Sequence, residues 1–119
     1  MNTDIKILIA DDSAFMRKVL RSILEGIGFS HFTECSNGRE CLKKYREERP
    51  DLILLDIVMP EIDGLGVLKE IGTAAKILVI SAVGQEKLIE EAKGYGAKGY
   101  IIKPFDNQKV VEEIKKVLE

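Results

Sequence analysis

The sequence predicts an α/β protein, built on a five-stranded parallel sheet that is doubly wound with five helices. Five short apolar runs alternate with segments whose apolar residues recur at helical spacing. The runs are apolar throughout rather than at every second position, which indicates strands that are buried on both faces. Right-handed crossovers between parallel strands place the helices on those two faces.

The first half of the chain contains two strand–helix pairs. Residues 5–10 are apolar and β-branched, and they end abruptly at Asp11-Asp12-Ser13, which predicts a buried strand followed by helix-capping residues. Apolar residues then recur at helical spacing over residues 15–27. A weaker strand around residues 32–35 leads to a second helix, marked by Cys41, Leu42 and Tyr45.

The next two strands are the most apolar of the chain. Residues 52–55 form the third strand, which ends in Asp56, and a loop leads from it to a short helix over residues 65–71. Residues 77–80 form the fourth strand, which ends in Ser81.

The last strand–helix pair closes the sheet. A helix around residues 88–92 precedes the fifth strand, residues 100–102, which ends in Lys103. We expect Asn107 to cap the final helix. Its inner face consists of Val110, Val111, Ile114, Val117 and Leu118.

Size and charge limit the classes of function. With 119 residues, the chain is expected to form one domain over residues 1–119. The formal charge of −2 argues against direct nucleic-acid binding, which usually needs a basic surplus. No secretory signal or apolar run long enough for a bilayer is visible, so we expect a cytoplasmic protein with no membrane association.

The cysteines and the histidine are poor candidates for chemistry. Cys35 and Cys41 match neither a redox motif nor a zinc site, so we expect small buried thiols. His31 has no Cys or His neighbours and is expected in a solvated loop.

Four of the five predicted strands end in polar residues. These are Asp11-Asp12, Asp56, Ser81 and Lys103. The carboxyl ends of parallel strands share one edge, and ligands of open α/β sheets bind there, where the strand order reverses. In the order 2-1-3-4-5, which is common among such sheets, the reversal lies between the first and third strands. Those two strands carry the aspartates.

Three carboxylates in one crevice repel each other, and Mg²⁺ relieves the repulsion at a site with few carboxylates and retained waters. A cation and the Lys103 ammonium beside one carboxylate form the kind of anion site that phosphoryl transfer requires. Asp56 stands alone at its strand end and is therefore the candidate nucleophile, and the Ser81 hydroxyl is a candidate donor to a phosphoryl oxygen. Taken singly, each residue has a structural alternative, since Asp12 or Ser13 would also cap a helix.

Short motifs in one order along the chain are more specific than any single residue. They are Asp11-Asp12, Asp56 with Met59-Pro60 and Asp63-Gly64, Ser81-Ala82, and Lys103-Pro104-Phe105. On these motifs the chain resembles the receiver domains of two-component response regulators, over residues 5–118. The resemblance implies a flavodoxin-like (CheY-like) fold.

The resemblance also implies roles for the site residues. Asp56 is the phospho-acceptor, and Asp12, Asp56 and the backbone carbonyl of Val58 bind Mg²⁺, or Mn²⁺ in its place. Asp11 acts largely through water. Lys103 pairs with the acceptor and phosphoryl oxygens. The Lys103-Pro104 peptide bond is expected to be cis.

Two further features concern the conformational switch and the lifetime of the phosphorylated state. Ser81 takes the place of the family's Thr or Ser and is expected to move toward the phosphoryl group, while Tyr100 rotates inward as the switch aromatic. Val58 and Val83 occupy positions that are often polar in the family and influence the attacking water. We hypothesise that self-dephosphorylation is altered here, in the direction of slower hydrolysis.

The expected partners follow from the same resemblance. A histidine kinase supplies the phosphoryl group, a protein target docks on the fourth helix, fifth strand and fifth helix, and a phosphatase is a further candidate. Residues 13–17, 37–40 and 81–85 are similar to the stand-alone chemotaxis type, which favours a motility switch or adaptor as target. Because the chain stops at Glu119, we expect output by docking onto another protein. We also expect a monomer that catalyses only its own phosphorylation and dephosphorylation.

Three alternatives remain open. A phosphorelay intermediate would present the same pocket. A Mg²⁺-dependent phosphohydrolase that uses an aspartyl phosphate usually places a DxD pattern after its first strand, whereas Asp11 and Asp12 are adjacent. A flavin module would need a Gly-rich phosphate loop at that position, where two aspartates repel phosphate.

Overall fold

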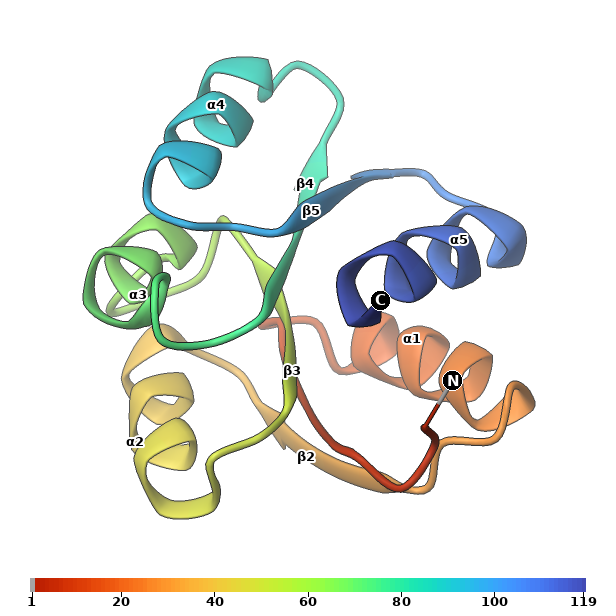
Figure 1. The fold of residues 1–119 in the computed structure, drawn as a ribbon. Helices are drawn as coiled ribbons and strands as arrows, with labels where there is room; N and C mark the ends of the chain where they lie inside the picture. The colour runs from red at the N-terminus through yellow and green to blue at the C-terminus, as the bar shows by residue number, and fades with distance from the viewer. Residues whose placement is uncertain (1) are drawn as a thin grey trace.

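Strands and helices alternate along the whole chain (Figure 1). The computed structural model describes residues 2–119. The strands are β1 (Lys6–Ala10), β2 (His31–Cys35), β3 (Leu52–Asp56), β4 (Ile77–Ala82) and β5 (Gly99–Lys103). The helices are α1 (Ala14–Gly26), α2 (Gly38–Glu48), α3 (Gly64–Ile71), α4 (Glu86–Gly94) and α5 (Asn107–Leu118).

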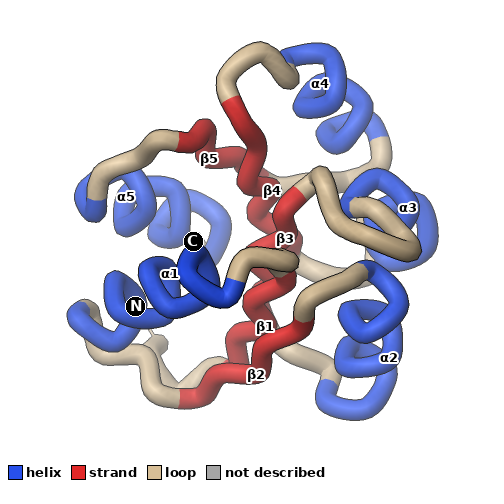
Figure 2. Tube along the Cα trace, turned by 180° about the vertical axis from the view of Figure 1, so that it is seen from behind, coloured by secondary structure: helices blue, strands red, loops and turns tan. Residues whose placement is uncertain are grey.

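The five strands form one sheet in the order β2-β1-β3-β4-β5, and each neighbouring pair is parallel. Helices α1 and α5 cover one face of the sheet, and α2, α3 and α4 cover the other (Figures 1 and 2). The predicted fold class, strand order and double winding are therefore confirmed.

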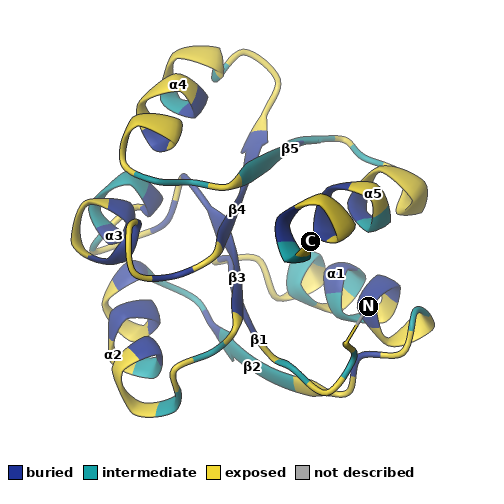
Figure 3. Cartoon of the chain, viewed as in Figure 1, coloured by how far each residue is buried: buried dark blue, intermediate teal, exposed yellow. Residues whose placement is uncertain are grey.

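Each face of the sheet has its own core, because successive strand residues point to opposite faces. Ile7 and Ile9 belong to the core under α1 and α5, whereas Leu8 and Ala10 belong to the core under α2, α3 and α4. Every residue of β3 is buried (Figure 3). This central strand is apolar throughout until Asp56, so a carboxylate at its end is held on a rigid support.

Polar side chains fix the starts of four helices. The caps are Ser13, Asn37, Asp63 and Asp106, and each accepts a hydrogen bond from a backbone N–H three residues on. The prediction that Asn107 caps the final helix is wrong. Asp106 has the extended backbone of a cap and accepts from Lys109 N at 2.8 Å, so Asn107 is the first helical residue.

The remaining sequence predictions differ from the structure in small ways. β4 continues through Ser81 to Ala82, because both residues pair with β5. His31 is exposed as expected but is not in a loop, since it pairs with Lys6 as the first residue of β2. Within the described part of the chain, no helix combines the length and apolar character needed to cross a membrane.

The two thiols are free and buried, as predicted. A hydrogen bond with Cys35, followed by burial, raises the pKa of the Cys41 thiol. The thiol therefore stays protonated and packs as a small apolar group.

Candidate functional site

Three carboxylates converge at the carboxyl edge of the sheet. Asp11 directly follows β1 and Asp56 ends β3, and these strands are neighbours. One carboxylate oxygen from each of Asp11, Asp12 and Asp56 lies within 4.8 Å of the others. Asp11 and Asp56 are buried, at 1% and 7% exposure, whereas Asp12 is exposed. The predicted cluster of three carboxylates is therefore present, and Asp12 is its solvent-exposed member.

Lys103 supplies a positive charge to the two buried carboxylates. Its Nζ atom lies 3.4 Å from Asp11 Oδ2 and 3.3 Å from Asp56 Oδ2. Burial, and then the charge of Asp11, raise the pKa of Asp56, and Lys103 offsets part of this effect. One ammonium among three carboxylates leaves an excess of negative charge at the site.

The backbone beside Asp56 packs tightly. Val58 N donates to Asp56 Oδ1 at 3.3 Å, and Gly64 N donates to the Ile57 carbonyl at 2.7 Å. A Cβ on Gly64 would lie 2.6 Å from the Asp56 carbonyl oxygen and 2.7 Å from the Ile57 Cα. The start of α3 can approach the acceptor strand this closely only because residue 64 has no side chain.

Ser81 lies in β4, between the strands that end in Asp56 and Lys103. Its side chain is fully buried, and the hydroxyl has no hydrogen-bond partner among residues 2–119. Buried polar atoms are usually paired, so an orphaned hydroxyl needs an explanation. A donor with no partner is available to a group that arrives at the site later.

The other predicted residues surround this centre. Tyr100 on β5 is half-buried, packs against the core beneath α2, α3 and α4, and has the Lys93 ammonium 4.8 Å from its ring centroid. Val58 and Val83 are 56% and 70% exposed and follow β3 and β4 at the same edge. The Lys103-Pro104 peptide bond is cis, as expected.

Arg17 contacts the site although the sequence predicts no role for it there. Its guanidinium donates from Nη1 to the backbone carbonyl of Asp11 at 2.6 Å, directly behind the acidic cluster. Residues 13–17 carry part of the resemblance to the chemotaxis type, but that segment does not reveal that the Arg17 side chain contacts the Asp11 backbone.

The donor set fits a hard divalent cation. All the ligand atoms that the three side chains offer are carboxylate oxygens, and one member of the set is exposed to solvent. Hard cations such as Mg²⁺ take oxygen ligands and retain water molecules. The uncompensated charge and the raised pKa of Asp56 both favour a bound cation.

This fold and site define the receiver domain of response regulators, and a family model for that domain matches residues 7–115. The chain belongs to this family, whose members bind Mg²⁺ at an acidic cluster of this kind. It is 45% identical to the chemotaxis protein CheY of Thermotoga maritima over 115 residues, which cover 94% of this chain and 96% of that protein. It is also 45% identical to the CheY of Bacillus subtilis, over 95% of this chain and 97% of the relative.

Solved structures agree with the assignment. The chemotaxis response regulator CheY4 of Vibrio cholerae superposes with a TM-score of 0.85 at 29% identity, over 97% of this chain and 99% of that one. A putative response regulator from Chloroflexus aurantiacus gives a TM-score of 0.90 at 28% identity, over 97% and 98% of the two chains. The chain is therefore a receiver of the CheY-like type.

Proposed function

We propose that Asp56 of this receiver accepts a phosphoryl group from a histidine kinase, and that the product controls binding to a protein of the motility apparatus. The observation that carries the proposal is the placement of Lys103 Nζ within 3.4 Å of both Asp11 and Asp56. An ammonium beside a buried carboxylate suits the transfer of an anionic group to that carboxylate, provided that a divalent cation offsets the charge of the two further carboxylates.

The transfer needs only the phosphohistidine donor, the Asp56 carboxylate and one proton from solvent. An Asp56 carboxylate oxygen attacks the phosphorus of a phosphohistidine, the P–N bond breaks, and the histidine nitrogen leaves with the electron pair and takes up a proton. The Lys103 ammonium stabilises the charge on the acceptor and phosphoryl oxygens. Hydrolysis of the acyl phosphate by water then releases inorganic phosphate and restores the Asp56 carboxylate.

The proposed direct ligands of Mg²⁺ are Asp12, Asp56 and the Val58 backbone carbonyl. Asp11 acts through water. When bound, the cation neutralises charge that develops on the phosphoryl oxygens. Mn²⁺ prefers the same oxygen donors and is an alternative ion. The chain's own contribution is to hold Asp11 and Asp56 buried on adjacent strands, so that the site exists before the cation arrives.

The switch uses Ser81 and Tyr100. A phosphoryl group brings strong acceptor oxygens, and the Ser81 hydroxyl, which has no partner among the described residues, donates to one of them. As Ser81 moves, Tyr100 turns inward and changes the surface formed by α4, β5 and α5. That surface is the proposed docking face, and a target that prefers the phosphorylated form also stabilises it by linkage.

The biological setting comes from the relatives, which are named as chemotaxis proteins. We place this receiver in the cytoplasm as a signalling protein that catalyses only its own phosphorylation and dephosphorylation. Its target is a motility switch or adaptor protein, and a phosphatase that shortens the signal is a further proposed partner.

Phosphoryl transfer from a purified, phosphorylated chemotaxis histidine kinase tests this proposal. The label is expected to move to the native chain and to Asp4→Asn, a control at an exposed aspartate, but not to Asp56→Asn. Transfer to Asp56→Asn at the native rate would place the acceptor elsewhere. Equal affinity for the motility target with and without phosphorylation would rule out the switch.

A further inference from the structure

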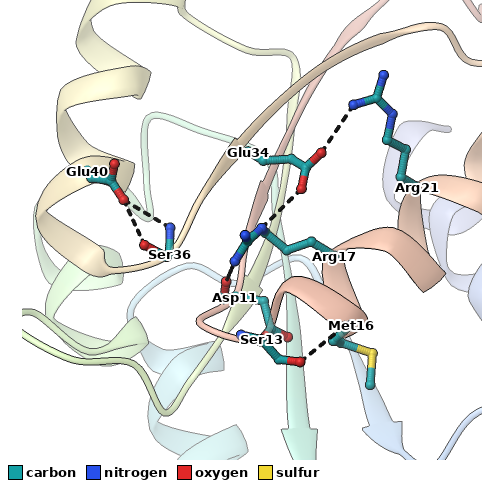
Figure 4. A network of polar contacts seen from close by, with 8 residues as sticks. All are labelled: Asp11, Ser13, Met16, Arg17, Arg21, Glu34, Ser36 and Glu40. Carbon is teal, nitrogen blue, oxygen red and sulfur yellow. Dashed lines mark hydrogen bonds and ion pairs between the residues drawn. The ribbon is translucent and has the colours of Figure 1, made fainter.

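Arg17 connects the acidic cluster to two other elements of the fold (Figure 4). Its guanidinium donates from Nη1 to the Asp11 carbonyl oxygen at 2.6 Å and from Nε to Glu34 Oε1 at 3.0 Å. The arginine side chain, on α1, is only 17% exposed, and Glu34 lies on β2. One planar group thus ties α1, β2 and the residue that follows β1.

Asp11 is held at each of its polar groups. Its backbone N–H donates to the Cys35 carbonyl at 3.1 Å, Oδ1 accepts from Ser13 N at 2.9 Å, and Oδ2 lies 3.4 Å from Lys103 Nζ. The carbonyl oxygen is the group that Arg17 holds. Because a peptide unit is planar, a fixed Asp11 carbonyl also fixes the plane in which Asp12 begins. The backbone of the exposed Asp12 is therefore oriented through Asp11.

The network behind Arg17 keeps the guanidinium in place. Glu34 Oε2 accepts from Arg21 Nη1 at 3.1 Å, so the glutamate is held between two arginines. Arg21 shares Glu34 with Arg17, whereas the hydrogen bond to the Asp11 carbonyl comes from Arg17. The two arginines therefore differ in one respect that matters here, because of the two only Arg17 hydrogen-bonds the backbone of Asp11 in the described residues.

We propose that Arg17 is a positioning residue for the cation site: it fixes the Asp11–Asp12 peptide and thereby sets the affinity for Mg²⁺. This inference rests on the proposed function of the acidic cluster. Loss of the partners that orient a metal ligand typically weakens binding about 10- to 100-fold. Lysine cannot replace Arg17, because a single ammonium lacks the planar fork that reaches a carbonyl and a carboxylate together.

A purely electrostatic role for Arg17 predicts the opposite change in Mg²⁺ affinity when the residue is replaced. Arg17 is a positive charge beside a cation site, so its removal should strengthen Mg²⁺ binding if charge alone mattered. Under the same assumption, Arg17→Lys should bind Mg²⁺ as the native chain does. Weaker binding in both Arg17→Lys and Arg17→Gln is expected only if the hydrogen bond to Asp11 is what counts.

Titration of the native chain, Arg17→Lys, Arg17→Gln and the control Arg21→Lys with MgCl₂, followed by the backbone amide NMR shifts, decides between these roles. Thermal unfolding in chelator checks that every variant is folded at the titration temperature. We expect the dissociation constant to rise about tenfold in both Arg17 variants and to stay at the native value in Arg21→Lys. If Arg17→Gln does not fold, the comparison of Arg17→Lys with Arg21→Lys is decisive by itself.

Two results would overturn the proposal and can be told apart. If the native chain binds Mg²⁺ and Arg17→Lys binds it as Arg21→Lys does, Arg17 has a structural role only, while the proposed function stands. If the native chain itself shows no Mg²⁺-dependent shifts near Asp11, Asp12 and Asp56, the cation site fails and the role of Arg17 fails with it.

Discussion

The Nζ atom of Lys103 lies 3.3 Å from an Asp56 carboxylate oxygen, although β4 separates the strands that these residues end. The lysine therefore reaches across the strand that carries Ser81. Its ammonium is also 3.4 Å from Asp11, so one positive charge compensates two buried negative ones. Negative charge therefore exceeds positive charge at this edge of the sheet unless a cation binds.

Replacement of Lys103 by Met should destabilise the cation-free protein. Asp11 and Asp56 would remain buried at close range without their shared partner, at a cost of about 2 kcal/mol, as for other hydrogen bonds between charged groups. Mg²⁺ should bind more tightly to the variant, because it no longer competes with an ammonium. Urea unfolding in chelator and Mg²⁺ titration measure the two effects, with the exposed Lys98→Met as control. Unchanged stability would show that Lys103 does not compensate the pair.

Replacement of Asp56 by Asn should stabilise the cation-free protein at pH 7, by about 1 kcal/mol, a usual size for one residue. The pKa of Asp56 is raised by burial and then by Asp11, so its ionised form opposes folding. This cost is fully present above the raised pKa and is lost as the pH falls toward the ordinary value of about 3.9.

Urea unfolding of native and Asp56→Asn protein at pH 7 and pH 4, in chelator, shows whether the substitution raises or lowers the free energy of unfolding. The stabilisation should shrink at the lower pH. Mg²⁺ at ten times its dissociation constant should stabilise the native chain by about 1.4 kcal/mol and Asp56→Asn by less. A variant that is less stable than the native chain at pH 7 would contradict the charge account.

Ser81→Ala should leave the unphosphorylated protein as stable as before, or about 1 kcal/mol more stable, since the buried hydroxyl that it removes has no partner in the described chain. The same variant should lose much of the gain in target affinity that phosphorylation produces. Thermal unfolding and target binding with a beryllofluoride mimic measure the two effects. A clear loss of stability would mean that the hydroxyl already has a structural partner.

Gly64→Ala should destabilise the protein by about 3 kcal/mol or more, toward the upper end of single-residue effects, because its Cβ would overlap the backbone of Asp56 and Ile57. Phosphorylation should slow as the acceptor backbone shifts. Gly94→Ala is the matched control, since a Cβ added there would meet nothing within 4 Å among the described residues, and Gly94 ends helix α4. Equal unfolding midpoints for the two variants would show that β3 and α3 can separate without cost.

Val58→Asn should change the lifetime of the phosphorylated protein. Val58 is 56% exposed beside Asp56, and its aliphatic side chain offers no group that can orient water. An amide at this position can hydrogen-bond the attacking water, so we expect faster loss of the phosphoryl group. The decay of a labelled sample after removal of the donor measures the rate. An unchanged decay rate would count against slow hydrolysis caused by the aliphatic side chain.

The sequence predicts which residues meet at the carboxyl edge of the sheet, because strand ends are visible in it. An apolar run that stops at a polar residue marks both the strand and its edge, and this places Asp11, Asp56 and Lys103 together before any coordinates are known. Gly64 belongs to the Asp63-Gly64 motif, and its close approach to the Asp56 backbone explains why a glycine stands there.

Other features depend on packing that the sequence does not display. Asp106 and Asn107 are equally good caps, and the backbone after Phe105 decides which of them begins α5. The contact between Arg17 and Asp11 requires the orientation of α1 on the sheet. The Ser81 hydroxyl is buried without a partner in the described chain on a strand with a core on each face, and the sequence alone does not show this arrangement.

The central claim is that Asp56 accepts a phosphoryl group with the help of a divalent cation. The most direct test is the intact mass of the protein after incubation with a small acyl phosphate, with Mg²⁺ and with chelator, for the native chain and Asp56→Asn. We expect a gain of one phosphoryl group that requires Mg²⁺ and is absent from Asp56→Asn. The same gain in Asp56→Asn, or a gain that survives removal of all divalent ions, would contradict it.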